Sequence, residues 1–338
     1  MTSESAYLQS KFVRTCLWWC WYGLILVLLF SCSHQPDRKI IRLAHGLDTN
    51  HPVHQAMVYM GDRLELKSKG TIEVLIYPGG QLGAERECLE LLQIGSLDIT
   101  KVSAAVLENF IPEYKVLSVP YIFKNTDHAH RIFDGQVGEE ILAKGAHSRL
   151  RGLTFYDAGS RSFYTKTKTI DKPEDLVGLK IRVQKSNMAV AMVNLLGGSP
   201  TPISWGELYT ALQQGVVDGA ENNLPSFYTS KHYEVCKYYS LNQHTAVPDV
   251  LLVGLDSWNR FSRKEQAWIR EAAKESAQYQ RRLWKASEEE SIKAIKKAGV
   301  IVTYPAKYLF EEKTRNIISI FENDPEILDI INKIRNEK

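Results

Sequence analysis

The chain has 338 residues and a nearly balanced charge, with 42 Lys and Arg residues against 39 Asp and Glu residues and a formal net charge of +3. It contains no long run of like charge, so it lacks the basic footprint of a nucleic-acid-binding protein. About 300 residues remain beyond the N-terminal segment, which exceeds one typical hydrophobic core and favours two lobes.

The N-terminal segment has the plan of an export signal. Lys11 and Arg14 precede residues 16–30, which carry no charge and are rich in Trp and Leu. This apolar stretch is shorter than the roughly 20 residues that a membrane-spanning helix needs. We therefore expect residues 1–31 to be a signal peptide that directs the protein to the periplasm.

The apolar stretch ends in a pattern that resembles the lipobox of bacterial lipoproteins. An apolar and a small residue, Phe30 and Ser31, directly precede Cys32, and polar residues follow. The resemblance implies a lipid on Cys32 that anchors the protein to a membrane, with residues 32–38 as a tether. Each buried CH₂ of an acyl chain contributes about 0.8 kcal/mol to such anchoring. An uncleaved anchor and a plain cleaved signal are the alternatives.

Two cysteines, Cys88 and Cys236, lie beyond the lipobox. Both occur in apolar helical or strand contexts, which favours buried free thiols. A disulfide between them is the alternative.

Strand and helix patterns alternate along the first half of the chain. β-branched and aromatic residues predict strands at residues 40–43, 72–77, 97–102 and 152–156. Helical patterns lie between them, at residues 53–69, 85–94 and 127–144. This alternation predicts an α/β fold with parallel or mixed sheets covered by helices.

The second half repeats this style. Strands are expected at residues 180–183, 219–221, 238–241 and 251–255, and helices at 188–196 and 205–214. The helix at 205–214 begins with Ser204 and Glu207 at capping-box spacing, and Gly215 ends it.

One helix is expected to be unusually long. Ser262 and Glu265 form another capping box, and neither Gly nor Pro follows before Gly299. About 35 residues at 1.5 Å each would span about 50 Å, which suits a helix that braces two lobes. Two helices joined at an unmarked kink are the alternative. Pro305 and Pro325 then punctuate a tail that should form two shorter helices.

Motifs of catalysis and metal binding do not occur in the sequence. It contains no G-x-S-x-G, H-E-x-x-H or C-x-x-C motif, and neither phosphate-binding glycine fingerprint. His51 and His54 lie close together, but no third ligand follows at metal spacing. We therefore expect neither an enzyme nor a bound metal or cofactor.

Four blocks together resemble one protein family. They lie, in chain order, at residues 77–99, 159–163, 176–183 and 198–222. They are similar to the DctP-type solute-binding proteins of TRAP transporters, which include sialic-acid, C4-dicarboxylate and uronate binders. The resemblance covers essentially the whole chain from Lys39.

The resemblance implies a two-lobed, periplasmic-binding-protein-like fold with mixed sheets, a hinge and a long bracing helix. Lobe I would comprise residues 39–158 and about 247–300. Lobe II would comprise residues 159–246 and about 301–338.

The residue that matches the family's carboxylate-binding arginine is Arg182. It ends the strand at 180–183, where a side chain can point from a sheet edge into a cleft. A guanidinium offers a planar fork of donors that pairs with both oxygens of a carboxylate. From the sequence alone, a surface arginine at a strand end is the alternative.

Two further residues of the second half match ligand contacts of the family. Arg161 corresponds to a second binding arginine, with a loop arginine paired to Asp157 as the alternative. Asn222 corresponds to the ligand asparagine, although asparagine also suits a turn or a helix cap. Neighbouring Asn223 is the better candidate for that structural role.

Three other predicted contacts come from both halves of the chain. Glu85 aligns with an acid that accepts hydrogen bonds from ligand hydroxyls, although the helix dipole also favours an acid there. His45 ends the first strand as a polar contact or a structural histidine. Trp205 would cover the ligand or join the core, and Gln184 and His244 are weaker candidates.

These residues suit a hexuronate such as D-glucuronate or D-galacturonate, with arginines for the carboxylate and polar groups for the hydroxyls. Ser103 stands where sialic-acid binders keep a carboxylate. A C4-dicarboxylate, the alternative together with other small organic acids, would call for a second cationic contact.

The resemblance also implies the partners. The protein would bind a small carboxylate ligand and deliver it to the small and large TRAP membrane subunits, DctQ-like and DctM-like, for ion-coupled uptake. A protein that feeds a ligand-sensing receptor is the alternative function.

Overall fold

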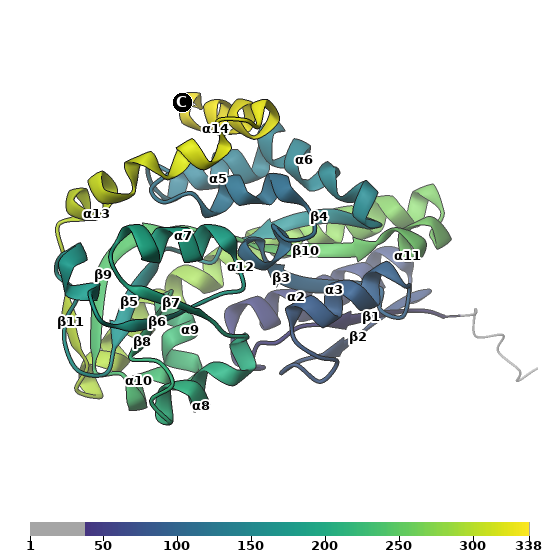
Figure 1. Ribbon diagram of the computed structural model, residues 1–338. Helices are drawn as coiled ribbons and strands as arrows, with labels where there is room; N and C mark the ends of the chain where they lie inside the picture. The colour runs from purple at the N-terminus through teal and green to yellow at the C-terminus, as the bar shows by residue number, and fades with distance from the viewer. Residues whose placement is uncertain (1–37, 338) are drawn as a thin grey trace, which may run out of the picture. The chain divides into compact units, whose positions relative to one another are not determined.

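The computed structural model describes residues 38–337, and its strands form two separate mixed sheets (Figure 1). The first sheet has the order β2-β1-β3-β10-β4, and the second has the order β11-β9-β5-β8-β6-β7. Strands of the first sheet are β1 (Lys39–Ala44), β2 (Ile72–Tyr77), β3 (Ile99–Ser103), β4 (Leu150–Tyr156) and β10 (Asp249–Gly254). Strands of the second are β5 (Arg161–Thr165), β6 (Lys180–Val183), β7 (Ser199–Pro202), β8 (Gly219–Asn222), β9 (Tyr238–Thr245) and β11 (Ile301–Thr303).

Helices cover both sheets, as the alternating sequence pattern predicts. The first half contains α2 (Pro52–Ser68), α3 (Glu85–Gln93), α4 (Ala104–Leu107), η1 (Pro112–Ser118), α5 (Thr126–Asp134), α6 (Gln136–Ala143) and η2 (Lys144–Ser148). The second contains η3 (Pro173–Leu176), α7 (Asn187–Leu195), η4 (Trp205–Glu207), α8 (Leu208–Gln213), α9 (Leu224–Thr229), α10 (His232–Val235), α11 (Leu255–Arg260), α12 (Arg263–Lys297), α13 (Lys307–Thr314), η5 (Arg315–Phe321) and α14 (Pro325–Asn336).

The predicted helix over 127–144 is divided in two at Gly135. The backbone of Gly135 is extended (φ −90°, ψ −173°), which ends α5 and allows α6 to begin at the next residue. A Cβ at Gly135 would lie 2.6 Å from the carbonyl oxygen of Arg131, so only glycine fits this junction.

Strand direction brings polar side chains to one edge of each sheet. In the second sheet, β6 is parallel to β8, and antiparallel β5 pairs Ser162 with Asn222. The carboxyl ends of β6 and β8 therefore meet the amino end of β5 at one edge. In the first sheet, Ser103 at the end of β3 pairs with Asp249 at the start of antiparallel β10. Cleft-forming side chains are expected where strands end in this way.

The long helix α12 joins the cores of the two sheets. It runs for 35 residues from a capping box formed by Ser262 and Glu265, as the sequence predicts. Trp284 of α12 belongs to the core beside β1, β4 and β10, whereas Ile295 belongs to the core beside β5, β8 and β9. The helix therefore braces both sheets. Among the described residues, no helix combines the length and the apolarity needed to cross a bilayer.

The chain crosses between the sheets at residues 157–160 and 246–248, close to the predicted lobe boundaries. Those boundaries themselves remain a prediction. Strand β11 pairs with β9 in the second sheet, but the last helix lies elsewhere. Helix α14 packs against α6 and η1, where Lys333 Nζ lies 2.9 Å from Glu140 Oε2 (Figure 1). The C-terminal segment therefore contacts elements of both halves.

Cys88 and Cys236 are buried free thiols, as expected. Burial raises the pKa of Cys88 to about 11 and that of Cys236 to about 12, so both thiols are protonated at neutral pH.

Close packing at the start of β8 generates a stability prediction. A Cβ at Gly219 would lie 2.4 Å from the carbonyl oxygen of Tyr164 on β5. Gly219→Ala must therefore shift β8, and we expect a loss of about 1–3 kcal/mol in the free energy of unfolding, measured by urea titration. Gly206→Ala is the control, because its Cβ position has no described atom within 4 Å apart from its own chain neighbours and local backbone. Equal stability of the two variants would contradict this packing argument.

Candidate functional site

A cavity of about 460 Å³ opens between the polar edges of the two sheets. Ala158 and Val247, one from each crossing segment, contribute to its lining. Its walls include six residues singled out from the sequence, namely Arg182, Arg161, Asn222, Glu85, Trp205 and Gln184. The structure thus brings residues of both halves of the chain to one cavity.

Arg182 presents a buried positive charge to this cavity. Its strand, β6, lies between β7 and β8, with Arg182 in register with Thr201 and Ala220. Only 2% of Arg182 is exposed. Its Nε donates to the carbonyl oxygen of Ile203 at 2.8 Å, whereas Nη1 is buried without a hydrogen-bond partner among residues 38–337. Burial lowers the pKa of Arg182, which shows that its charged form lacks full compensation.

Arg161, in contrast, has a hydrogen-bond partner for each of its three guanidinium nitrogens. Its Nε donates to Glu221 Oε2, and its Nη2 donates to Glu221 Oε1 at 2.8 Å. Its other terminal nitrogen donates to Asn222 Oδ1 at 2.7 Å. Burial acts to lower the pKa of Arg161, but Glu221 outweighs it and raises that pKa. The alternative partner Asp157 instead contacts His130 at 2.6 Å.

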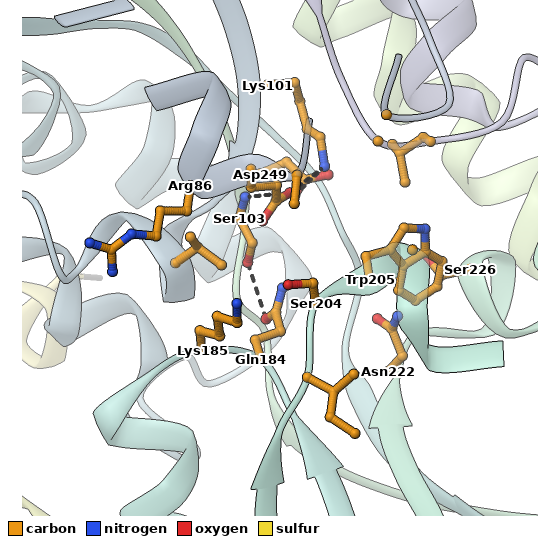
Figure 2. Close-up of a pocket in the computed structure, with 18 of the residues that line it drawn as sticks. Arg86, Lys101, Ser103, Gln184, Lys185, Ser204, Trp205, Asn222, Ser226 and Asp249 are labelled. Atoms are coloured by element: carbon orange, nitrogen blue, oxygen red, sulfur yellow. Dashed lines mark hydrogen bonds and ion pairs between the residues drawn. The ribbon is translucent and has the colours of Figure 1, made fainter. Parts of the chain in front are cut away.

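Three ionisable residues with little exposure also reach the cavity, two from strands of the first sheet and one, Glu85, from the start of α3. Lys101 Nζ lies 3.1 Å from Glu85 Oε1 and 3.3 Å from Asp249 Oδ1 (Figure 2). Lys101 and Asp249 were not singled out from the sequence. Burial acts to lower the pKa of Lys101, but the two carboxylates outweigh it and raise that pKa. Lys101 is therefore charged, although it lies in the middle of a buried strand.

One polar contact joins the two walls directly. Ser103 Oγ, at the end of β3, donates to Gln184 Oε1, just beyond β6, at 3.2 Å (Figure 2). Trp205 lines the cavity and also packs against both neighbouring cores, so its position is compatible with either of its two predicted roles.

Two candidate histidines lie behind the wall of the cavity. His45 Nδ1 accepts from the backbone N–H of Leu47 at 3.1 Å, and His45 Nε2 lies 3.0 Å from His54 Nδ1. Burial lowers the pKa of His45 to about 3, so the ring is neutral. His244 Nε2 lies 3.5 Å from Glu221 Oε2, behind Arg161. His45 and His244 are not among the residues that line the cavity.

The chemistry available at this site is anion binding together with hydrogen bonding. Arg182 supplies an uncompensated cation, and Asn222, Gln184 and the Lys101 cluster supply neutral or charged hydrogen-bonding groups. No group of three or more potential metal-ligating side chains occurs in residues 38–337.

Glu221 generates a pH prediction. Burial acts to raise its pKa, but Arg161 and His244 outweigh it and lower the pKa from 4.5 to about 2. Ionised Glu221 thus adds about 3 kcal/mol to the free energy of unfolding. This contribution is fully present above the pKa of about 4.3 that glutamate has in the unfolded chain, and it is lost as the pH falls towards 2.

Glu221→Gln should therefore destabilise the protein by about 3–5 kcal/mol at pH 7, because Arg161 loses its buried partner. In urea titrations the difference in the free energy of unfolding between this variant and wild type should become smaller between pH 4 and pH 2. Glu322→Gln, at an exposed position, serves as the control. A difference that stays constant with pH would show that Glu221 does not titrate as described.

Comparison with known proteins adds independent evidence. The model of the family "Bacterial extracellular solute-binding protein, family 7" (DctP) matches residues 43–324. A solute-binding protein of Chromohalobacter salexigens is 35% identical over 315 residues, which cover 93% of each chain.

Solved structures of TRAP periplasmic solute-binding proteins are similar along the whole of their chains. One from a Bradyrhizobium species, in complex with α/β-D-galacturonate, has a TM-score of 0.86 and 38% identity and covers 88% of this chain and 100% of its own. Another from Roseobacter denitrificans, with bound β-D-glucuronate, has a TM-score of 0.86 and 34% identity, and the match covers 89% of this chain and 100% of that one.

Proposed function

The chain belongs to family 7 of the bacterial extracellular solute-binding proteins, the DctP proteins of TRAP transporters, and on that premise we propose that it binds a hexuronate. The observation that carries the proposal is the buried, uncompensated guanidinium of Arg182. A ligand carboxylate would supply both the missing negative charge and an acceptor for Nη1. The relatives with bound D-galacturonate and D-glucuronate support a sugar acid as the source of that carboxylate.

Arg161 is proposed to complete the carboxylate site. Its pairing with Glu221 and Asn222 holds the guanidinium at the cavity wall before any ligand arrives. A preorganised donor loses less conformational entropy on binding than a mobile one. Asn222 and Glu85 would then contact ligand hydroxyls, and Trp205 would cover an apolar face of the sugar.

The proposed mechanism is capture without turnover. The cavity walls come from both sheets, so a ligand that contacts both walls would stabilise the closed arrangement of the lobes. The Ser103–Gln184 hydrogen bond is one contact between the walls that closure would preserve. The ligand-loaded protein would then dock on the small and large TRAP membrane subunits for ion-coupled uptake.

Arg182→Met tests the proposal most sharply. In isothermal titration calorimetry, the change should weaken binding of D-galacturonate or D-glucuronate by on the order of 100- to 1,000-fold, because a charge-assisted pair is lost. It should also leave the unliganded protein as stable as wild type or more stable, since an apolar side chain replaces an unpaired buried charge.

Arg86→Met provides the matched control for this experiment. Arg86 lies at the exposed rim of the cavity, with 59% of its side chain exposed, and pairs with Glu90 on the same helix. The control should bind the hexuronate almost as wild type does. Unchanged affinity in Arg182→Met would refute the proposed carboxylate site.

Lipid anchoring is proposed on the sequence alone, because Cys32 lies outside the described residues. Members of the family act outside the cytoplasm, and a lipid on Cys32 would hold this one at a membrane surface. In the native bacterium, Cys32→Ser should move the protein from the membrane fraction to the soluble fraction, as immunoblotting would detect. Wild-type protein found wholly in the soluble fraction would rule out the anchor.

A further inference from the structure

We infer that the buried cluster of Lys101, Glu85 and Asp249, hereafter the acidic triad, restricts the cavity to ligands that carry a single carboxylate. The inference rests on the proposed function and refines it. It separates hexuronates from aldarates, which are six-carbon sugar acids with a carboxylate at each end. It likewise separates them from C4-dicarboxylates.

The acidic triad carries one negative charge in excess. Two carboxylates share the single ammonium of Lys101, at 3.1 Å from Glu85 and 3.3 Å from Asp249. The side chains of these three residues are only 4%, 17% and 13% exposed, so water screens their charges poorly. The backbone N–H of Ser103 donates to Glu85 Oε1 at 3.1 Å and stabilises the excess charge in part. Burial raises the pKa of Asp249, as expected for an acid in such surroundings.

The other buried charges of the cavity leave no buried cation for a second carboxylate, and the two remaining cations of the described lining, Arg86 and Lys185, are exposed to solvent. Glu221 already neutralises Arg161. Arg182 is the other buried arginine of the described lining, and no described carboxylate pairs with it. The first ligand carboxylate would neutralise it. A second carboxylate in the same cavity would therefore face the net negative charge of the acidic triad.

Like charges repel strongly where the effective dielectric constant is low. Recognition that places such a repulsion against the wrong ligand gains selectivity without adding any contact to the right one. A hydroxyl group, in contrast, carries no charge and can donate to Glu85 or Asp249 and accept from Lys101. The acidic triad therefore favours the neutral, hydroxyl-bearing part of a uronate over a second acid group.

Titration calorimetry with matched ligand pairs tests this inference. D-galacturonate and galactarate share one carbon skeleton but differ at C1, which is a hemiacetal carbon in the ring form of the former and a carboxylate in the latter. Wild type should bind D-galacturonate at least about 100-fold more tightly. D-glucuronate and D-glucarate form a second pair that should behave in the same way.

Charge-neutralising variants separate charge from ligand shape, because the shape difference within each pair is the same for every variant. Asp249→Asn leaves Lys101 and Glu85 as a neutral pair, and the uronate-to-aldarate affinity ratio should fall about tenfold or more. Glu85→Gln removes the other acid and should act in the same direction, so a folding defect in one variant leaves the other available. Glu90→Gln, at an exposed position on the same helix and outside the cavity lining, should leave the ratio unchanged.

The outcomes distinguish the two proposals. A ratio that stays at its wild-type value in both Asp249→Asn and Glu85→Gln would overturn the role of the acidic triad, while tight uronate binding would keep the proposed function. Equal binding of uronate and aldarate by wild type would also overturn the triad's role. Failure of wild type to bind any uronate would overturn the proposed function and the refinement together.

Discussion

The site depends on one buried charge that the protein itself does not neutralise. Arg182 is 2% exposed, and its Nη1 has no partner among the described residues. Burial of an unpaired charge costs several kcal/mol, so a fold keeps one only where something else offsets that cost. A bound carboxylate can do so, and the sheet order that places β6 between β7 and β8 holds Arg182 at the cavity edge. Helix α12 packs against both of the sheets whose edges form that cavity.

The charged groups around Arg182 have different roles because their partners differ. Arg161 is neutralised by Glu221 and so contributes a fixed donor with little net charge. Lys101 is shared by two acids and so belongs to a cluster of negative sign. The cavity therefore contains one attractive site for an anion and one region that prefers neutral polar groups. Such an arrangement lowers the stability of the unliganded protein in exchange for affinity, a common feature of binding sites.

Local sequence patterns predicted most elements, whereas the six ligand contacts came from the family resemblance. Five of those six residues line the cavity, and His45 does not. Arg182 could be placed because a short β-branched strand ends beside it, and α12 because its capping box and uninterrupted helical pattern are local signals. The acidic triad could not be predicted in this way, since Lys101 and Asp249 lie 148 residues apart and meet only through the pairing of β3 with β10. A lysine at the centre of an otherwise uncharged strand was the one available signal. His45 was placed at a strand end correctly, but its ring turns towards His54 and Leu47, a direction that spacing alone does not determine.

The most direct test of the account compares D-galacturonate with its methyl ester by titration calorimetry on wild-type protein. The two molecules share their ring and hydroxyl groups, but the ester carries a methyl group in place of the negative charge that Arg182 would neutralise. If that charge is the main attraction, the ester should bind on the order of 100-fold more weakly or not at all, as expected for loss of a charge-assisted, buried pair. Equal affinity for acid and ester would show that the uncompensated charge of Arg182 does not select the ligand.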